Sequence, residues 1–512
     1  MMNLETYITT SGETILYCGA PDFELLERLV LGAGDLWHSS LDQGFTNSFE
    51  DIIYQTAVYW WFLNDFEGSN QVVSWRVHPS CFAIRKKVWE QLGGFDEVYN
   101  SLVMKGIDLG YNLLRNQSGL PLYVKGLFAS ETNTIQIPSN DRYLFYKKHF
   151  KIHHSYYMLF RKGLFNCFSE IKAFNYAKNH FVKKEVSPIS PRKLNPIEGN
   201  PTVSLVIPTM RRQKYAQLLL EDHKNQTYPV SQVVIVDATP EEERDANYYN
   251  PSDFNFKLEV YWQTTKGSCR ARNEALEKCT GEYVIFADDD IRIQPNFVEN
   301  HIRLLQTYNA DACNGLDIMA ENMHQNLDDL EDRLNKLGDK RWFVGVARAF
   351  SNANSCVKRA WIDKIGYNDV NFDGGYGEDS DFGIRLIKNG ALVLQNPFSA
   401  NLHLKPPTGG YRWWGSQASI IGKKRKQQPW ELDNPVKYIK PVPSPTITYG
   451  ILKHFKPHQV AEWRKKHFFI YLLKAPLKVM LLRFLIYPYK QIQFSKSIQY
   501  AKGLINLGER FK

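Results

Sequence analysis

The pattern of apolar and polar positions changes character about two-fifths of the way along the chain. From residue 203 onward, short runs typical of buried strands alternate with longer patterns typical of helices. We expect strands at 203–207, 232–237, 257–262 and 283–287, with helices at 213–226 and 268–278. This β-α-β-β-α-β order predicts an α/β domain with three layers and a mostly parallel sheet.

A proline-rich segment separates this region from the one before it. Residues 187–201 hold four prolines and little apolar content, which is typical of a linker. The earlier part mixes strand-like and helical runs, and its last thirty-odd residues look helical, basic and aromatic. We therefore expect a first domain at 1–150, a helical segment and linker at 151–200, a second domain at 201–415 and a helical tail at 416–512.

A repeat with an offset of 273 residues relates the two domains. Residues 103–116 align without a gap on residues 376–389, and residues 84–86 fall on 357–359 at the same offset. The first domain is thus expected to be a partial, diverged copy of the second. Glu378 and Asp379 correspond to Lys105 and Gly106, so we expect the copy to be non-catalytic.

Three adjacent acids, Asp288, Asp289 and Asp290, follow the fourth expected strand. The first and second strands end in Thr209 and Asp237, and ligands of open α/β sheets bind outside the carboxyl ends of the strands. Adjacent carboxylates repel one another unless a cation lies among them, and oxygen ligands suit Mg²⁺ or Mn²⁺. The alternative is a solvated acidic loop that caps the next helix. The buried strand before the triplet favours the ligand site.

Composition indicates packed domains in a reducing compartment. Hydrophobic residues make up 43% of the chain, and its seven cysteines include no CxxC pair, which argues against a disulfide scaffold or a zinc site. The N-terminus lacks the pattern of a signal peptide, and no run of about 18 uncharged apolar residues predicts a membrane span.

Five motifs occur in order along the second domain: Val206-Ile-Pro-Thr-Met-Arg-Arg, Val234-Ile-Val-Asp, Lys266-Gly-Ser-Cys-Arg-Ala-Arg-Asn, Phe286-Ala-Asp-Asp-Asp and Gly377-Glu-Asp-Ser-Asp. Together they resemble family 2 of the glycosyltransferases, over roughly two-fifths of the chain. The resemblance implies the GT-A fold and transfer of a sugar from a nucleoside-diphosphate sugar, with Mn²⁺ or Mg²⁺ as cofactor. The first domain would then be a degenerate GT-A-like domain.

The same resemblance assigns donor and metal contacts. Asp290 matches the metal-binding position and Asp288 the position near the ribose; Asp289 contacts the donor or serves only as a helix cap. The nucleoside contacts would be Thr209, Arg211 and Asp237, although Ala238 replaces the usual second acid and Asp237 alone could be a turn residue.

Residues 266–273 place a flexible glycine before a helix start with two arginines, which suits phosphate oxygens. Arg270 and Arg272 lie two positions apart and face different ways on a helix. The geometry allows only one of them to contact the donor while the other pairs with a carboxylate. The family resemblance implies that Gly267, Arg272 and Asn273 contact the donor, which leaves Arg270 for the carboxylate.

An inverting transfer needs one base to take the proton of the acceptor hydroxyl. Asp379 matches the family's base, and Glu378 and Asp381 are expected to orient the acceptor or the helix. His403 would complete the metal shell or be structural. Trp413 belongs to a segment that resembles a mobile lid, or it packs against the tail.

The basic excess of the chain lies in its tail. Residues 451–512 hold 13 Lys and Arg against 2 acids, and the net charge of the chain is +9. From 463 to 485 a helical pattern combines a basic stripe with an apolar surface, and Pro476 should kink it. This pattern is typical of a helix lying on an anionic membrane surface. Packing on the catalytic domain or on a second subunit is the alternative.

We therefore expect a cytoplasmic, peripheral enzyme at the inner face of the membrane, with a saccharide or lipid-linked saccharide as acceptor. Two other classes remain: a sugar-nucleotidyltransferase, which should show a glycine-rich loop after the first strand, and a non-catalytic saccharide-binding subunit, which fits residues 1–150 only. No recognisable module supports nucleic-acid binding.

Overall fold

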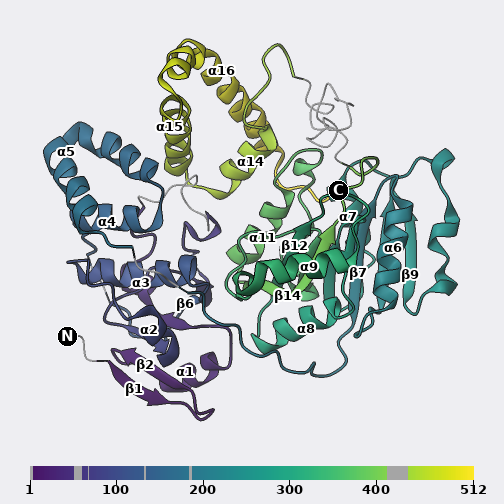
Figure 1. Cartoon of the computed structure of the whole chain (residues 1–512), viewed down its shortest axis with the longest axis horizontal. Coiled ribbons are helices and arrows are strands. Elements are labelled where there is room, and N and C mark those ends of the chain that lie inside the picture. The colour runs from purple at the N-terminus through teal and green to yellow at the C-terminus, as the bar shows by residue number, and fades with distance from the viewer. Residues whose placement is uncertain (1–3, 51–59, 67, 132–133, 184–186, 412–435) are drawn as a thin grey trace. The chain divides into compact units, whose positions relative to one another are not determined.

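The computed structural model describes residues 4–50, 60–66, 68–131, 134–183, 187–411 and 436–512, which form two compact units (Figure 1). Unit 1 comprises residues 1–191, 343–348 and 456–485. Unit 2 comprises residues 192–342, 349–455 and 486–512. The chain thus passes from unit 1 to unit 2 inside the proline-rich segment, and the C-terminal region contributes to both.

An eight-stranded sheet forms the centre of unit 2, in the order β11-β14-β12-β13-β10-β7-β8-β9. The strands are β7 (Val203–Thr209), β8 (Gln232–Asp237), β9 (Lys257–Trp262), β10 (Tyr283–Ala287), β11 (Ile291–Ile293), β12 (Ala312–Met319), β13 (Asn354–Lys358) and β14 (Val393–His403). The four strands expected from the sequence, β7 to β10, are parallel neighbours. The antiparallel pairs lie among the later strands, where β13 runs against both β10 and β12. The α/β fold class is confirmed.

Helices cover this sheet. They include α6 (Gln213–Lys224), α7 (Ser268–Leu276), α8 (Phe297–Thr307) and α11 (Glu378–Lys388), each of which packs against strands. Every residue of β7, β8 and β10 is buried. Continuous burial of parallel strands requires cover on both faces, so the unit is layered as the alternating pattern predicts.

Unit 1 has its own six-stranded sheet, in the order β1-β2-β5-β3-β6-β4. The strands are β1 (Glu5–Ile8), β2 (Thr14–Cys18), β3 (Leu36–His38), β4 (Gln71–Val73), β5 (Phe82–Arg85) and β6 (Pro121–Val124). The helices of this part are α1 (Phe23–Val30), α2 (Lys86–Leu92), α3 (Leu102–Asn116), α4 (Ser139–His149) and α5 (Ile152–His180). Its core includes Leu36, Val77, Phe82, Ile84 and Leu113.

The two sheets share part of their arrangement. In unit 1, β5 lies antiparallel between β2 and β3, and β3 is parallel to β6. In unit 2, β13 lies antiparallel between β10 and β12, and β12 is parallel to β14. At the offset of 273, α2 coincides with α10 (Arg359–Ile365) residue for residue. The sequence repeat therefore corresponds to a repeated strand arrangement.

The described part of the tail, residues 436–512, contains three helices and is not one body. Helix α14 (Pro445–His454) lies in unit 2, and α15 (Pro457–Leu473) lies in unit 1, where Glu462 accepts hydrogen bonds from Tyr157 and Arg161. The expected kink at Pro476 is a break between α15 and α16 (Leu477–Leu507). Residues 486–507 of α16 belong to unit 2, where Phe494 and Ala501 are buried. Among the described helices, none is long and apolar enough to cross a membrane.

Candidate functional site

The carboxyl ends of β7, β8 and β10 bring their polar residues together, as the strand order predicts. Thr209 and Asp237 are register partners on neighbouring strands. The Thr209 hydroxyl donates to Asp289 Oδ2 at 2.6 Å, so β7 is joined directly to the acid triplet after β10. All three side chains are buried.

Two arginines and a histidine neutralise the triplet. Arg212 Nη1 lies 3.2 Å from Asp289 Oδ1 and 2.8 Å from Asp290 Oδ2, Arg272 Nη2 donates to Asp288 Oδ1 at 2.7 Å, and His403 Nε2 lies 3.2 Å from Asp290 Oδ1. The alternative of a solvated acidic loop does not describe Asp289 and Asp290, which are 4% and 2% exposed. Buried carboxylates need such partners to remain charged.

The surroundings separate the pKa values of the two buried acids. Burial, together with the charge of Asp290, raises the pKa of Asp289 to about 7 despite the nearby Arg212. Burial also opposes ionisation of Asp290, but His403 and Arg212 outweigh it and lower the pKa of Asp290 to about 2. Asp290 is therefore the carboxylate that stays charged at neutral pH.

Asp288, Asp290 and His403 form a set that fits a divalent cation. One ligand atom from each of them lies within 4.8 Å of the other two. Two carboxylate oxygens and an imidazole nitrogen suit Mn²⁺ and are compatible with Mg²⁺. His403 Nδ1 lies 3.3 Å from both oxygens of Asp317, a carboxylate that orients the ring and that the sequence motifs did not indicate. Burial opposes protonation of His403, but Asp290 and Asp317 raise its pKa well above the ordinary value.

The structure places Arg212, which the sequence analysis did not single out, among the acids, and the expected nucleoside contact of Arg211 stays a prediction. Arg211 has a positive φ of 58°, and its Nη2 donates to Glu243 at 2.7 Å. Arg212 is buried and also donates to the carbonyl oxygens of Thr408 and Pro406. Both arginines stand in the first motif, but their different directions depend on the positive φ at Arg211, which the sequence does not reveal.

Asp237 lies at the predicted strand end and is held by its own neighbours. The amide of Thr239 donates to its Oδ1 at 2.8 Å, and the Tyr249 hydroxyl donates to its Oδ2 at 2.9 Å. Burial raises the pKa of Asp237 in spite of these bonds. The bond from the Thr239 amide is the local contact expected of a turn residue, whereas the bond from Tyr249 is not.

The start of α7 is occupied by a carboxylate that the motifs did not indicate. Asp373 accepts from the Cys269 amide at 2.7 Å and from Arg270 Nη1 at 2.8 Å, so Arg270 pairs with an acid as expected. A Cβ on Gly267 would lie 2.3 Å from Asp373 Cγ, which explains the glycine. The amide of Asn273 bonds with the backbone of Asn368 and Phe511, and its predicted donor contact stays a prediction.

Arg272 is buried near acids of two motifs, the triplet at 288–290 and the acids at the start of α11. It pairs with Asp288, and the charges of Asp288, Asp379 and Glu378 outweigh burial and raise its pKa. Its Nε and Nη1 atoms are buried and have no hydrogen-bond partner among the described residues. A buried guanidinium with two unused donors provides a place for the oxygens of an anionic ligand.

Helix α11 carries the other predicted acids. Asp379 is half-buried, and Asn352 Nδ2 donates to its Oδ1. Asp381 is buried and is bound by Arg385 Nε and His454 Nε2, each at 2.8 Å, and by Lys453. Asp381 thus bonds within α11 and to Lys453 and His454, while Glu378 is buried beside Arg272, and the expected roles of both acids stay predictions.

The predicted lid is described only in its first part. Gly410 donates from its amide to the Met210 carbonyl at 2.7 Å, and a Cβ there would lie 2.8 Å from Arg212 Cζ. The Tyr411 hydroxyl lies within hydrogen-bond distance of the Thr209 carbonyl and of Gln263. Trp413 lies outside the described residues.

The geometry agrees with comparisons to known proteins. Residues 204–366 match the family described as Glycosyl transferase family 2. The chain is 22% identical over 258 residues to "Chondroitin synthase" of Pasteurella multocida (strain Pm70), covering 42% of this chain and 26% of that protein. It is 32% identical over 108 residues to "Putative glycosyltransferase EpsH" of Bacillus subtilis (strain 168), covering 20% and 30%.

Among solved structures, Staphylococcus aureus TarS 1–349 in complex with UDP-GlcNAc aligns with a TM-score of 0.37 and 16% identity, covering 59% of this chain and 81% of that chain. The chain spans about a quarter to a third of the length of the two curated relatives. These matches identify residues 204–366 as a family 2 glycosyltransferase domain.

Proposed function

We propose that the chain is an inverting, metal-dependent glycosyltransferase that moves a sugar from a nucleoside-diphosphate sugar to a saccharide or lipid-linked saccharide. The observation that carries this proposal is the position of Arg272. It is bonded to Asp288 of the candidate metal site, lies in the field of Asp379 and Glu378, and has two buried donors without partners among the described residues. A site that joins a cation, an anion receptor and a carboxylate base suits transfer from a diphosphate.

The donor would bind along the rim formed by Thr209, Asp237 and the acid triplet. Mn²⁺ or Mg²⁺ held by Asp288, Asp290 and His403 would offset the charge that develops on the leaving diphosphate. The unused nitrogens of Arg272 would bind its oxygens. Burial of this guanidinium strengthens its electrostatic effect, because the surrounding dielectric is low.

Asp379 would act as the base. Its side chain is half-buried, and the hydrogen bond from Asn352 holds one oxygen in place. By taking the proton of an acceptor hydroxyl, this carboxylate would let the acceptor oxygen bond to the anomeric carbon opposite the departing diphosphate, and this single displacement inverts the anomeric centre. Unit 1 has Gly106 at the corresponding position, which supports the proposal that it is a diverged and non-catalytic copy.

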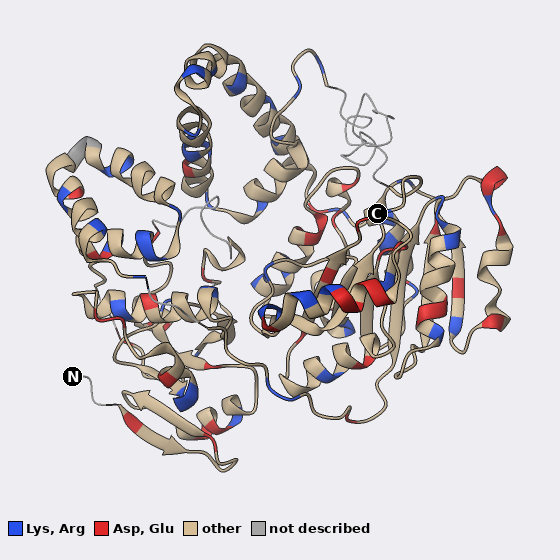
Figure 2. Ribbon diagram, in the orientation of Figure 1, with Lys and Arg blue, Asp and Glu red and all other residues tan. Residues whose placement is uncertain are grey.

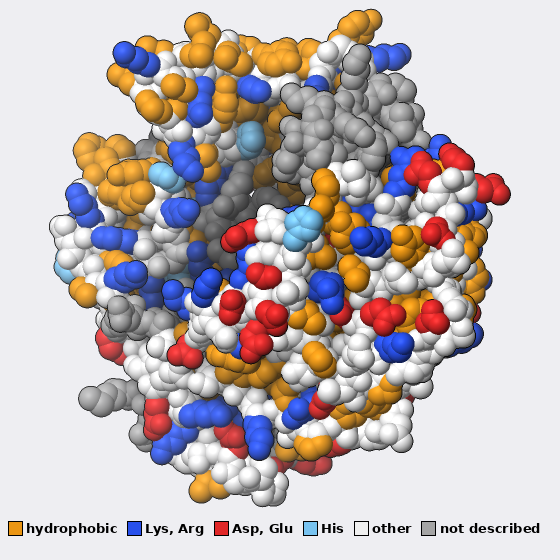
Figure 3. All heavy atoms as spheres, turned by 45° about the vertical axis from the view of Figure 1, so that its right-hand side comes forward, with side chains coloured by type: hydrophobic (Ala, Val, Ile, Leu, Met, Phe, Trp, Pro, Cys, Tyr) orange, Lys and Arg blue, Asp and Glu red, His pale blue; other side chains and the backbone are white. Residues whose placement is uncertain are grey.

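The acceptor would be presented at a membrane surface. Large apolar side chains of α15 and α16 are exposed: Leu473, Leu477, Leu481, Leu482, Phe484 and Leu485. The exposed Lys474 and Lys478 lie among them. Figure 2 marks in blue the Lys and Arg positions along these helices, and Figure 3 shows hydrophobic side chains in orange at the top of its view. An apolar surface with cations suits the anionic inner leaflet, which supports a peripheral location in the cytoplasm.

A screen of nucleotide sugars tests the function. Native-state ligands raise the melting temperature, so one donor with Mn²⁺ or Mg²⁺ should stabilise the chain and release its nucleoside diphosphate when an acceptor is present. Asp290→Ala should lose the cation-dependent part of this stabilisation and lower turnover by about 10²-fold or more. Asp363→Ala, an exposed carboxylate of the same unit, serves as the control.

Two results would contradict the proposal. If stabilisation and turnover did not change in Asp290→Ala, the acid triplet would not be the cation site. Release of pyrophosphate from a nucleoside triphosphate and a sugar phosphate would indicate a sugar-nucleotidyltransferase instead.

A further inference from the structure

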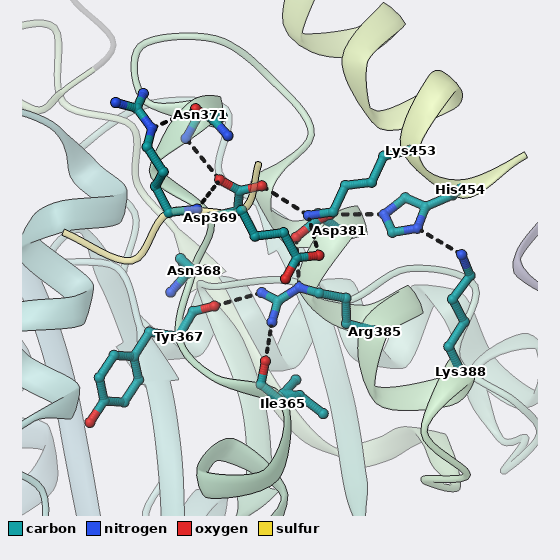
Figure 4. A network of polar contacts seen from close by, with 12 residues as sticks. Ile365, Tyr367, Asn368, Asp369, Asn371, Asp381, Arg385, Lys388, Lys453 and His454 are labelled. Atoms are coloured by element: carbon teal, nitrogen blue, oxygen red, sulfur yellow. Dashed lines mark hydrogen bonds and ion pairs between the residues drawn. The ribbon is translucent and has the colours of Figure 1, made fainter. Parts of the chain in front are cut away.

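A network of charged residues ties α11 to α14 in unit 2 (Figure 4). Lys453 Nζ lies 2.9 Å from Asp369 Oδ2 and 2.6 Å from Asp381 Oδ1, and His454 Nε2 lies 2.8 Å from Asp381 Oδ1. The Tyr449 hydroxyl adds a bond to Asp369 at 2.6 Å. The two acids together outweigh the cost of burial and raise the pKa of Lys453.

Unit 1 contains the same network. Asp96 and Asp108 stand 273 positions before Asp369 and Asp381. Lys148 Nζ lies 2.7 Å from Asp96 and 2.6 Å from Asp108, and His149 Nε2 lies 2.8 Å from Asp108. Both Lys-His pairs belong to the sequence Lys-His-Phe-Lys, at 148–151 and at 453–456. The copy thus extends to the helices that follow the sheets.

The two networks differ in what lies against them. In unit 2, residues 509–511 cover the network: Glu509 Oε1 lies 3.1 Å from Lys453 Nζ, and the Arg510 amide donates to Asp369 Oδ1 at 3.3 Å. The Phe511 ring lies 5.7 Å from the Arg385 guanidinium. An ammonium group has three donors, and Lys453 uses them on Asp369, Asp381 and Glu509.

In unit 1 a cavity of about 610 Å³ lies beside the corresponding network, where unit 2 has residues 509–511. Asp96, Asp108 and Lys148 line it, together with Asn112, Asn116, Gln117, Arg115, Phe95 and Lys183. Asn112 stands where unit 2 has Arg385, whose guanidinium reaches the carbonyls of Ile365 and Tyr367. The shorter side chain leaves that space open.

The polar groups of this cavity have unused capacity. Lys148 pairs with Asp96 and Asp108, which leaves one of its three donors without a partner among the described residues. Gln117 is 2% exposed, and its Oε1 has no hydrogen-bond partner among the described residues. The volume lies within the range of small-ligand pockets, about 300–1,000 Å³.

We propose that this cavity of unit 1 binds a saccharide that carries a carboxylate, whose oxygens take the place on Lys148 that Glu509 takes on Lys453. Arg115 adds a second cation to the wall. The amides of Asn112, Asn116 and Gln117 suit sugar hydroxyls, and Phe95 offers an apolar face. The choice of a saccharide over a peptide rests on the proposed glycosyltransferase function, because the acceptor or product chain is then the available ligand.

The test fills the cavity in the way that unit 2 fills its own. Asn112→Arg introduces the counterpart of Arg385. Arg385 donates to the carbonyls of Ile365 and Tyr367, and Leu92 and Gly94 are the counterparts of these two residues in unit 1. The full-length variant should keep its melting temperature. It should bind a tetrasaccharide of alternating glucuronic acid and N-acetylglucosamine at least about tenfold more weakly than the unmodified chain, because the arginine side chain occupies the space that the saccharide would enter. Gln136→Arg, which adds the same charge at an exposed loop position, should bind normally.

Each of three outcomes would overturn the inference. If the Asn112→Arg variant bound the acidic tetrasaccharide as tightly as the unmodified chain, the saccharide would bind elsewhere. If the unmodified chain bound uncharged chitotetraose equally tightly, the carboxylate of the saccharide would not be recognised. Binding of a peptide with the sequence of residues 504–512, without binding of the saccharide, would make the cavity a peptide site. Donor-induced stabilisation of the unmodified chain is measured in parallel, so failure of the proposed function is seen independently of this cavity.

Discussion

Asp379 can be tested by a change that keeps its shape. In Asp379→Asn the amide still fits beside Asn352 but cannot take a proton from an acceptor hydroxyl. We expect the rate of transfer to fall by about 10²–10⁴-fold, the usual contribution of a general base, while donor binding stays largely intact. Steady-state transfer and donor-induced thermal shifts measure the two effects. Asp328→Asn, an exposed carboxylate on another helix, should behave as the unmodified chain; an unimpaired Asp379→Asn variant would exclude the base role.

At the scale of single residues, the sequence predicted positions at strand ends better than it predicted their partners. Thr209 and Asp290 follow strands with a clear apolar pattern, so topology alone brings them to one rim. The pairing of Arg212 with the acids could not be predicted, because its direction depends on a positive φ at Arg211. Asp317 and Asp373 reach the site from strands and loops whose pairing no local pattern reveals.

At the scale of elements, Lys466 on α15 gives a test by pH. It is 3% exposed, its Nζ lies 3.2 Å from His154 Nδ1, and burial lowers its pKa from 10.5 to about 7. Between these values the unfolded chain binds more protons than the folded chain, so the free energy of unfolding should rise with pH from about 7 to about 10.5. Below pH 7 both states hold the proton, and the cost of burying the charge is complete.

Lys466→Met should therefore raise the free energy of unfolding at neutral pH by about 1 kcal/mol and flatten its rise toward alkaline pH. Urea titrations between pH 6.5 and 9.5 measure both effects. The neighbouring Lys465→Met removes an exposed charge and should change neither. A stability that rises equally steeply in the Lys466→Met variant would assign the pH dependence to another group.

Helices and strands could be predicted where the spacing of apolar residues follows a single pattern. The observed β7, β8, β9 and β10 begin and end within two residues of the expected limits, because buried strands between helices leave continuous apolar runs. The antiparallel position of β13 between β10 and β12 was not predictable, since it depends on contacts between segments far apart in sequence. The tail was expected as one region, yet buried residues such as Trp463 in unit 1 and Phe494 in unit 2 divide it.

At the scale of the whole molecule, the two units kept different parts of a shared plan. Both retain the Asp-Asp-Lys-His network, whose buried charges cannot be lost singly without leaving an unpaired partner. Only unit 2 has the acid triplet and Asp379, which nothing in the packing of a sheet requires. We infer that the network serves stability and that the proposed catalytic acids serve function.

Membrane attachment is the property of the whole chain that can be tested most directly. Truncation before α15 would remove side chains that are buried in both units, so point substitutions are the better test. Leu481 and Leu485 are 61% and 79% exposed. Leu481→Ser with Leu485→Ser should reduce flotation with anionic liposomes by about tenfold or more, because each leucine that enters the interface contributes roughly 1.5 kcal/mol.

Leu507→Ser, which changes an exposed leucine at the far end of α16, is the matched control and should float normally. Cations contribute to binding through anionic lipid, so flotation of the unmodified chain should also weaken on neutral liposomes and at high salt. Equal flotation of the double variant and the control would mean that this surface does not contact the membrane. Packing against a second copy would then be the remaining explanation for its exposed leucines, and sedimentation of the same variants would detect it.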